Sequence, residues 1–180
     1  MVTKALVEIK NCEAISISEW KELINIFFES SGTSVFSSIE KKNKFLYKYF
    51  MYYKETYPDY FYAVYIDHHV RGYICGAPDT STDLFFADNH SYLALLKEEL
   101  RIYPAHLHIN LHSSNRGAGL GSLLIKRIEE ALGKSKVRGL HIVTDAKARN
   151  ISFYKSRGFI FTKELVFNKS TLVFMGKSLK

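Results

Sequence analysis

Apolar side chains recur along this chain in two spacings, one typical of helices and one typical of strands. Ser18 precedes a run with a spacing near 3.6 residues, which predicts a Ser-capped amphipathic helix that ends near Gly32; its apolar members are Trp20, Leu23, Ile24, Phe27 and Phe28. A second helix is predicted over residues 38–53, with Pro58 after it. Its apolar face carries Phe45, Leu46, Tyr49, Phe50 and Tyr53.

Shorter β-branched and aromatic runs predict strands. Residues 5–10 form one such run, and the runs 60–66 and 70–76 flank Asp67-His68-His69, which predicts an antiparallel hairpin. Asn89 is expected to cap a helix that reaches Leu100 and stops at Pro104. The remaining pattern predicts a strand over 105–112, a helix from Ser122 to Gly133, a strand over 139–144, a short helix over 149–156, and strands over 159–167 and 171–175.

This mixture of strands and helices predicts an α/β or α+β fold. With 180 residues and no internal repeat, low-complexity tract or Pro/Ser-rich linker, the chain fits one domain over residues 1–180 and excludes a large multidomain enzyme. The 13 Phe and 12 Tyr against 10 Gly and 3 Pro exclude collagen-like and disordered composition. No apolar run is long enough to cross a bilayer or to form a secretory signal, so a soluble cytoplasmic protein is expected.

The positions of the cysteines and histidines predict no metal or redox site. Cys12 and Cys75 belong to no CxxC pair and are expected to be packing residues. His68 and His69 are adjacent in a turn and point to opposite faces, so no metal site is predicted.

The formal charge of +7 fits a nucleic-acid binder, and it also fits a domain that handles a phosphorylated cofactor. The distribution favours the second interpretation, because many basic residues surround a glycine-rich segment. They are Lys126, Arg127, Lys134, Lys136, Arg138, Lys147, Arg149, Lys155 and Arg157.

That segment places a strand, a glycine-rich loop and the start of a helix in succession. Its loop reads Arg116-Gly117-Ala118-Gly119-Leu120-Gly121-Ser122. Glycine allows successive amides to point toward one anion, and the helix N-terminus adds partial positive charge, so the loop is a candidate pyrophosphate cradle. No Gly-Lys-Ser/Thr closes it and no N-terminal βαβ unit precedes it, which disfavours ATP and NAD. A purely structural turn is the alternative interpretation.

The loop resembles the R/Q-x-x-G-x-G/A signature of the GNAT N-acetyltransferase superfamily. Downstream, Asn150, Phe153-Tyr154 and Gly158-Phe159 are similar to the second recurrent segment of that superfamily. The resemblance covers a core over about residues 105–161, and the strand, two helices and hairpin predicted before this core extend it over the whole chain. It implies a GNAT fold with a central mixed, mostly antiparallel sheet of about six to seven strands. The stretches 72–80 and 103–109 are also similar to acetyltransferase-like domains related to bacterial O-GlcNAcase.

The resemblance implies acetyl-CoA as the acetyl donor and coenzyme A as the product. By position, the amides of Arg116, Gly117, Ala118, Gly119, Leu120, Gly121 and Ser122 would hold the pyrophosphate. Backbone groups of Ile109, Asn110 and Leu111 would pair with the pantetheine arm. Asn150 would contact that arm, Phe153 would pack beside it, and Tyr154 would lie near the thioester sulfur.

Acetyl transfer to an amine requires a base for the ammonium proton and a donor for the leaving thiolate. Period-two alternation places His106, His108 and Asn110 on one face of the strand before the loop. His108 is the first candidate for the base, directly or through water, and His106 is the second and a weak candidate for substrate binding. Histidines satisfied within the sheet are the alternative interpretation. The narrower relatives would carry an acid where this chain has Asn110, which cannot accept a proton and is expected to position other groups.

Tyr154 is the candidate donor to the thiolate, with core packing as its alternative. Asp79, which follows Pro78, is a weak candidate for binding a cationic amine, and turn formation is the commoner use of Pro-Asp. No cysteine lies within the matched motifs, so direct attack on the thioester in a ternary complex is expected.

Three functions remain open at this point. The first is an acetyl-CoA-dependent N-acetyltransferase that acts on a primary amine of a small molecule or protein, with no nucleic acid or membrane as partner. The second is a CoA-binding regulatory or interaction module that has lost catalysis. The third, a nucleic-acid-binding domain, lacks a recognised binding motif. The oligomeric state is left open, with a homodimer as one option.

Overall fold

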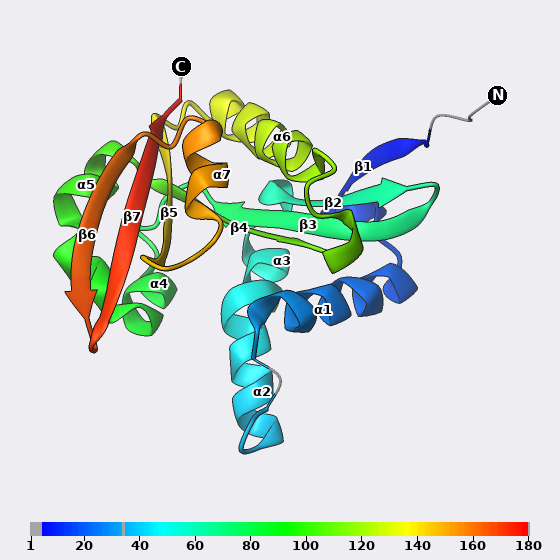
Figure 1. Ribbon diagram of the computed structural model, residues 1–180, viewed down its shortest axis with the longest axis horizontal. Helices are drawn as coiled ribbons and strands as arrows, with labels where there is room; N and C mark the ends of the chain where they lie inside the picture. Colours follow the sequence, from blue (N-terminus) through cyan, green and yellow to red (C-terminus); the bar gives the residue numbers. More distant parts are fainter. Residues whose placement is uncertain (1–4, 34, 180) are drawn as a thin grey trace. The chain divides into compact units, whose positions relative to one another are not determined.

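The structure is a computed structural model and describes residues 5–33 and 35–179. The chain forms two compact units: one comprises the chain up to Gly76 together with His108–Ala131, and the other comprises Ala77–Leu107 and the chain from Leu132 onward. Its strands form a seven-stranded sheet in the order β1-β2-β3-β4-β5-β7-β6 (Figure 1), and the residues of β4 are divided between the units. The chain therefore has the predicted mixed α/β fold.

The first unit begins with β1 (Val7–Asn11), a single 3₁₀ turn (Cys12–Ala14) and α1 (Ile17–Ser31). The cap of α1 is Ser16 and not the predicted Ser18. The Ser16 hydroxyl accepts the Glu19 N–H at 3.4 Å, while the Glu19 carboxylate accepts the Ser16 N–H at 2.7 Å. This reciprocal capping box favours Ser16 over Ser18. Gly32, with φ of +66°, ends the helix as predicted.

The second predicted helix forms, but not as one regular element. It consists of α2 (Ile39–Leu46), a π-helical turn η2 (Tyr47–Met51) and α3 (Tyr52–Thr56), and a short 3₁₀ turn (Pro58–Tyr60) comes next. The Ser38 hydroxyl caps α2 by accepting the Lys41 N–H. The π turn was not predicted, because the aromatic positions fit a helical period with or without it.

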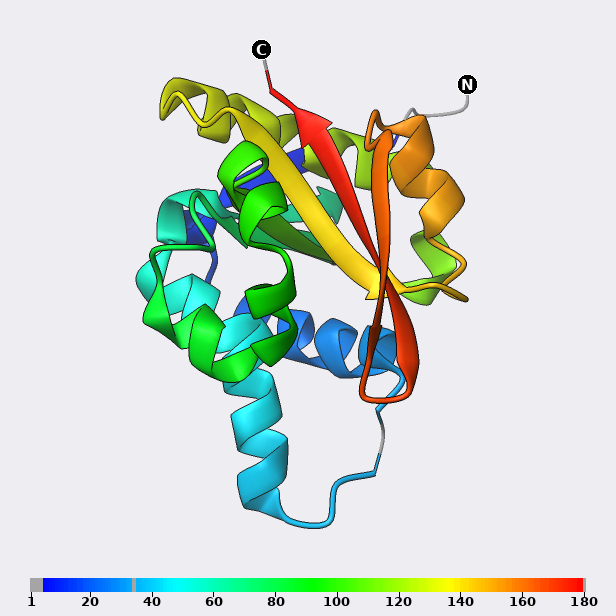
Figure 2. The same cartoon turned by 90° about the vertical axis from the view of Figure 1, so that its left-hand side faces the viewer.

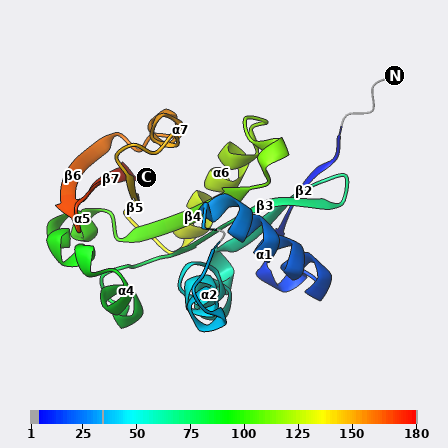
Figure 3. The same cartoon turned by 60° about the horizontal axis from the view of Figure 1, so that its bottom comes forward.

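The predicted hairpin is formed by β2 (Phe61–Ile66) and β3 (His69–Ala77). Asp67 and His68 have φ of +49° and +66°, as a tight two-residue hairpin turn requires. β1 pairs antiparallel with β2. Helices α1, α2 and α3 lie on one face of these strands and α6 (Leu120–Lys134) lies on the other, as Figures 1 and 3 show.

In the second unit, the predicted helix that begins at Asn89 is wrong. Asp83 caps a helix α4 (Leu84–Asn89) by accepting the Phe85 N–H at 2.8 Å, and Asn89 lies at the end of that helix. A 3₁₀ segment (Ser91–Leu95) and the separate helix α5 (Lys97–Ile102) come after it. Asp83 and Asn89 are both good N-cap residues, and the apolar pattern does not decide between them.

The last elements are β4 (Ala105–Leu111), a 3₁₀ turn (Ser113–Asn115), β5 (Gly139–Asp145), α7 (Ile151–Ser156), β6 (Phe161–Phe167) and β7 (Ser170–Ser178). β5 runs parallel to β4, and β7 pairs antiparallel with both β5 and β6. Helices α4 and α5 lie on one face of β5, β7 and β6, and α7 lies on the other (Figure 2). Gly133 does not end α6. The left-handed residue after that helix is Lys136, with φ of +57°.

Each unit has its own apolar centre. In the first unit, Tyr73 stacks on Phe61 at a centroid distance of 5.4 Å, and Phe50 meets both rings edge-on. In the second unit, the Tyr103 ring covers strand glycines Gly139 and Gly176, where a Cβ would lie less than 3 Å from it. An aromatic ring thus covers the strands within each unit.

Candidate functional site

The loop between β4 and α6 is held in one conformation by two glycines. Gly117 and Gly119 have φ of +81° and +83°, and a Cβ at either position would have no atom within 4 Å. The backbone conformation, and not the available space, is thus the reason that glycine is needed here. The loop leads directly into Leu120, the buried first residue of α6.

Two backbone hydrogen bonds mark the ends of the loop segment whose amides are candidates for binding an anion. The Arg116 N–H donates to the Ser113 carbonyl at 3.4 Å, and the Ser122 N–H donates to the Gly119 carbonyl at 3.0 Å. These two bonds leave the stretch from Gly117 to Gly121 as the central part of the predicted cradle. It precedes a helix of 15 residues, whose N-terminus carries partial positive charge.

The end of α1 is tied to this loop by side-chain hydrogen bonds. The Ser30 hydroxyl donates to the Leu111 carbonyl at 3.3 Å, and the Arg116 guanidinium bonds both that carbonyl and the Ser30 hydroxyl at 3.4 Å. Arg116 therefore links α1 to the end of β4. The Leu111 carbonyl, one of the backbone groups predicted to face pantetheine, already accepts both of these bonds.

Glu29 is a residue of this region that the sequence did not single out. Its carboxylate accepts the Ser113 N–H at 3.2 Å and lies 3.9 Å from Nε2 of His112. The hydrogen bond from Ser113, with the charges of His112 and Arg116, lowers the pKa of Glu29. An ionised carboxylate thus stands beside the start of the loop.

A cavity of about 620 Å³ opens beside Glu29. The Phe28 and Phe36 rings meet edge-on at 5.9 Å, and the Lys42 ammonium lies 4.7 Å from the centroid of Phe28. Among the described lining residues, Glu29 is the one carboxylate; they are Asn25, Phe28, Glu29, Thr33, Phe36, Ser38, Ile39 and Lys42. The cavity combines aromatic surface with one negative side chain, Glu29, and one positive side chain, Lys42.

His108, the predicted base, is partly buried on β4. Its Nε2 lies 3.0 Å from the hydroxyl of the buried Tyr53, and the Tyr49 ring meets the imidazole edge-on. Burial, with a smaller contribution from the Lys48 charge, lowers the pKa of His108 to about 4. The imidazole is therefore neutral at physiological pH.

Asn110 has a positioning role within the first unit. Its amide nitrogen donates to the Tyr73 hydroxyl at 2.6 Å. Tyr73 is wholly buried, and burial raises the pKa of its phenol. The amide therefore satisfies a buried polar group whose lack of a partner would be costly.

His106 and Asp79, the weaker candidates, lie in the second unit. Thr80 donates its hydroxyl proton to the Pro104 carbonyl at 2.8 Å, so its oxygen accepts from Nδ1 of His106 at 2.6 Å. His106 is buried, with the Phe86 ring 4.5 Å away. Asp79 accepts the N–H and the hydroxyl of Ser81 within a turn. These contacts favour structural roles for both residues.

The residues of the second motif are placed by α7. Gly158 has φ of +91°, which turns the chain so that Phe159 packs on the Tyr154 ring at 5.4 Å. The Phe153 ring also contacts Tyr154, at 5.4 Å, and the Asn150 side chain accepts the Thr144 hydroxyl proton at 3.3 Å. Burial raises the pKa of Tyr154, which therefore stays protonated at neutral pH.

The structure thus groups the predicted residues by unit. His108, Ile109, Asn110, Leu111 and the loop from Arg116 to Ser122 belong to the first unit. The second contains Asp79, His106, Asn150, Phe153 and Tyr154. Within the described residues, no cluster of histidine, cysteine and acidic side chains could hold a metal ion. No helix in this part of the chain has the length and apolar character needed to cross a membrane.

Comparison with solved structures shows the same fold in several other proteins. SsHAT is 17% identical with a TM-score of 0.71, and the match covers 97% of this chain and 98% of SsHAT. The putative acetyltransferase yncA from Salmonella typhimurium, solved with its cofactor acetyl-CoA, is 17% identical with a TM-score of 0.63 and coverage of 97% and 94%. A ribosomal-protein-alanine N-acetyltransferase from Brucella melitensis is 20% identical with a TM-score of 0.62 and coverage of 96% and 99%.

These solved structures share too little sequence identity to show the family of this chain, but a family model does show it. The model of the acetyltransferase (GNAT) family matches residues 19–159, which include both the glycine-rich loop and α7. This match spans more than half of the sequence and draws on both units. The chain therefore belongs to the acetyltransferase (GNAT) family.

Proposed function

We propose that this protein is an N-acetyltransferase that uses acetyl-CoA and acetylates a primary amine by direct attack in a ternary complex. The observation that carries the proposal is the loop with left-handed Gly117 and Gly119 between β4 and a 15-residue helix, in a chain of this family. The family match draws on both units, which supports one acetyltransferase domain over residues 1–180.

The residues around the loop fit the anionic end of acetyl-CoA. Amides from Gly117 to Gly121 would bind the pyrophosphate, helped by the N-terminus of α6. The absence of any atom within 4 Å of a Cβ built on Gly117 or Gly119 leaves room for phosphate oxygens at the backbone. In the first unit, backbone groups of Ile109 and Asn110 are the proposed contacts of the pantetheine arm. The contacts of Asn150 and Phe153, in the second unit, stay predictions from the sequence.

When bound, acetyl-CoA supplies an acetyl group activated as a thioester. His108 is neutral above a pKa of about 4, so it has a lone pair with which to accept the ammonium proton of the acceptor, directly or through water. An ammonium nitrogen has no lone pair, so this proton leaves before the neutral amine attacks the thioester carbonyl. Tyr154 has a raised pKa and is proposed to stabilise the leaving thiolate by hydrogen bonding while largely keeping its own proton.

The cavity beside Glu29 is the proposed place for the acceptor. An ammonium group finds there the ionised carboxylate of Glu29, while the Lys42 ammonium already covers the Phe28 ring. Glu29 also bonds Ser113 at the start of the loop, so the cavity and the loop share one residue. Glu29 is therefore the proposed contact of the acceptor's amine, and the Phe28 and Phe36 rings suit a partly apolar body.

A CoA-binding module without catalysis is the second candidate function. The observation that favours it is the bond between Asn110 and Tyr73, because this position carries a structural amide where an acid would offer a base. Binding of acetyl-CoA without turnover on any amine would identify this alternative. The narrower resemblance to O-GlcNAcase-related domains and a homodimeric state stay predictions from the sequence.

The proposed cofactor site is tested by isothermal titration of the protein with acetyl-CoA and with CoA. We expect both to bind to the wild type and binding to be lost in Arg116→Glu, which puts a negative charge at the start of the loop that is proposed to hold the pyrophosphate. Arg138→Glu is the matched control, since it changes the net charge equally at an exposed residue beyond the end of α6. Failure of the folded wild type to bind either ligand, or an equal loss in both variants, would contradict the proposal.

A further inference from the structure

The cavity beside Glu29 lies between α1 and α2, within the first unit. Its lining residues come from the second half of α1 and the loop after it, and from the chain around the start of α2. Its volume of about 620 Å³ falls in the range of pockets that hold small organic molecules, roughly 300–1,000 Å³. The Phe28 and Phe36 rings supply aromatic surface. The cavity therefore has the size and lining for a small molecule with an apolar body.

The negative side chain of the cavity comes from the last turn of α1. The pKa of Glu29 is lowered, so its carboxylate is ionised, and the Ser113 N–H donates to one of the two oxygens. The other oxygen lies 3.9 Å from Nε2 of His112, which is beyond hydrogen-bonding distance. A carboxylate accepts several hydrogen bonds, so Glu29 can also accept one from an ammonium group.

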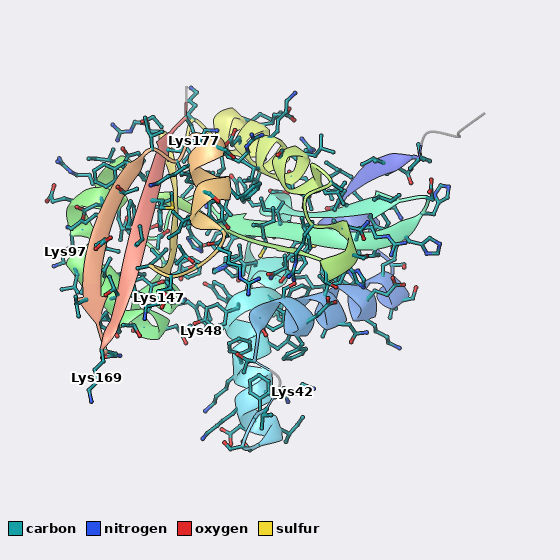
Figure 4. All side chains as sticks on the ribbon, viewed as in Figure 1. Lys42, Lys48, Lys97, Lys147, Lys169 and Lys177 are labelled. Atoms are coloured by element: carbon teal, nitrogen blue, oxygen red, sulfur yellow. The ribbon has the colours of Figure 1, made fainter. Side chains whose placement is uncertain are left out.

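The positive side chain of the cavity is Lys42, on α2 (Figure 4). Its ammonium lies 4.7 Å from the centroid of the Phe28 ring. Among the described residues, no carboxylate pairs with this ammonium, whereas Lys44 on the same helix pairs with Glu40 at 3.0 Å. An ammonium has three N–H donors, so Lys42 can bind an anionic group of a ligand.

These two charges disfavour a ligand with a single charge. A ligand with only an ammonium group is attracted by Glu29 and repelled by Lys42, and the converse holds for a ligand with only a carboxylate. Residues 38–48 carry four lysines and one glutamate, which adds positive potential on the side of α2. A ligand with both charges can pair with both side chains.

We propose that the acceptor is a zwitterion: a small apolar molecule with a primary amine that Glu29 binds and a carboxylate that Lys42 binds. The proposal rests on the proposed function and names the substrate class of that site, of which apolar amino acids are the simplest members. Glu29 is bonded to Ser113 at the start of the glycine-rich loop, so the amine is held on the side of the cavity next to the loop. In the reaction, the amine nitrogen bonds the acetyl carbon and the C–S bond breaks. The two protons that the ammonium group loses go to the thiolate and to solvent.

NMR titration of the protein tests the proposal with two amino acids that differ in the spacing of their charges, phenylalanine and 4-(aminomethyl)benzoic acid. Each is compared with its carboxamide, which keeps only the amine charge, and with its N-acetyl derivative, which keeps only the carboxylate. We expect at least one of the two amino acids to bind with a Kd about 2- to 5-fold lower than that of either derivative, the effect of one exposed ion pair.

Three variants assign this preference to the two side chains. Lys42→Gln should abolish the preference over the carboxamide, and Lys42→Glu should reverse it. Glu29→Gln should abolish the preference over the N-acetyl derivative. Lys44→Gln is the matched control, because it removes a lysine charge from the same helix at a residue outside the described lining of the cavity, and both preferences should persist.

Equal Kd values for each amino acid and its carboxamide would overturn the proposal, as would a preference that survives in Lys42→Gln or a lack of binding by every compound. The titrations require no turnover. A protein that shows the expected preferences but transfers no acetyl group would contradict the proposed function alone. Acetylation of the carboxamides as fast as of the amino acids would contradict the zwitterionic acceptor alone.

Discussion

Substituting alanine for Gly119 tests whether the loop conformation is responsible for binding coenzyme A. An L-residue in the left-handed region costs about 1–2 kcal/mol, and Gly119 has φ of +83° with no atom near a new Cβ. The penalty is therefore one of backbone conformation alone. The loop is exposed and can relax when free, so we expect most of the penalty to appear as a Kd for CoA about 5- to 30-fold higher.

Gly133→Ala provides the matched control. Gly133 also has open space around its Cβ position, but it lies in the last turn of α6 without a positive φ. Alanine there should stabilise the protein by up to about 1 kcal/mol and leave the Kd unchanged. Calorimetric titration with CoA and urea unfolding of all three proteins give both quantities. A Gly119→Ala protein with wild-type stability and wild-type Kd would refute the reasoning, as would equal losses at the two glycines.

Three further predictions concern side chains. Tyr154→Phe should lower kcat about 100-fold or more while the Kd for CoA stays unchanged, because only thiolate stabilisation is removed. Stopped assays measure kcat and titration measures the Kd. An unchanged kcat would argue for a packing role. Glu29→Gln keeps an acceptor for the Ser113 N–H but loses the charge, so KM for a cationic amine should rise several-fold, whereas Glu22→Gln, a change on the same helix, should not affect it. His108 has a depressed pKa in the folded protein, so between pH 6.5 and 4 the unfolded chain binds more protons than the folded one, and the free energy of unfolding falls as the pH is lowered. In urea unfolding, His108→Gln should show a weaker fall of this free energy with pH. An equal fall in both proteins would contradict the assigned pKa.

Much of the fold can be predicted from local sequence signals. The hairpin turn at Asp67-His68, the C-cap at Gly32 and the order of strands and helices around the glycine-rich loop were predicted from turn residues and periodicity. The region over residues 83–102 was predicted wrongly, because Asp83 and Asn89 compete as caps and only the hydrogen bond to Phe85 decides between them. Ser16 was missed although Ser16-Ile17-Ser18-Glu19 has the pattern of a capping box.

In the candidate site too, residues within a local motif were predicted, and residues placed only by tertiary contacts were missed. Gly117, Gly119 and Gly158 were predicted from motifs, and each has the positive φ that explains its glycine. Glu29 and Tyr53 left no sequence signal, since each acts through a partner more than 50 residues away. A contact of that kind depends on tertiary packing, and the helical period alone places Tyr53 only on an apolar face. The π turn likewise shows itself only in backbone hydrogen bonds.

Acceptor-dependent release of the CoA thiol tests the central claim most directly. The protein is incubated with acetyl-CoA and with primary amines of different character, including alkyl and aryl amines, amino sugars and peptides with a free N-terminus. Free thiol and the acetylated amine are both quantified. We expect at least one cationic amine with an apolar body to yield one acetylated product per thiol released, and Tyr154→Phe to lose this activity. Tight binding of acetyl-CoA with no acetylated product from any amine would contradict it and would identify a CoA-binding module.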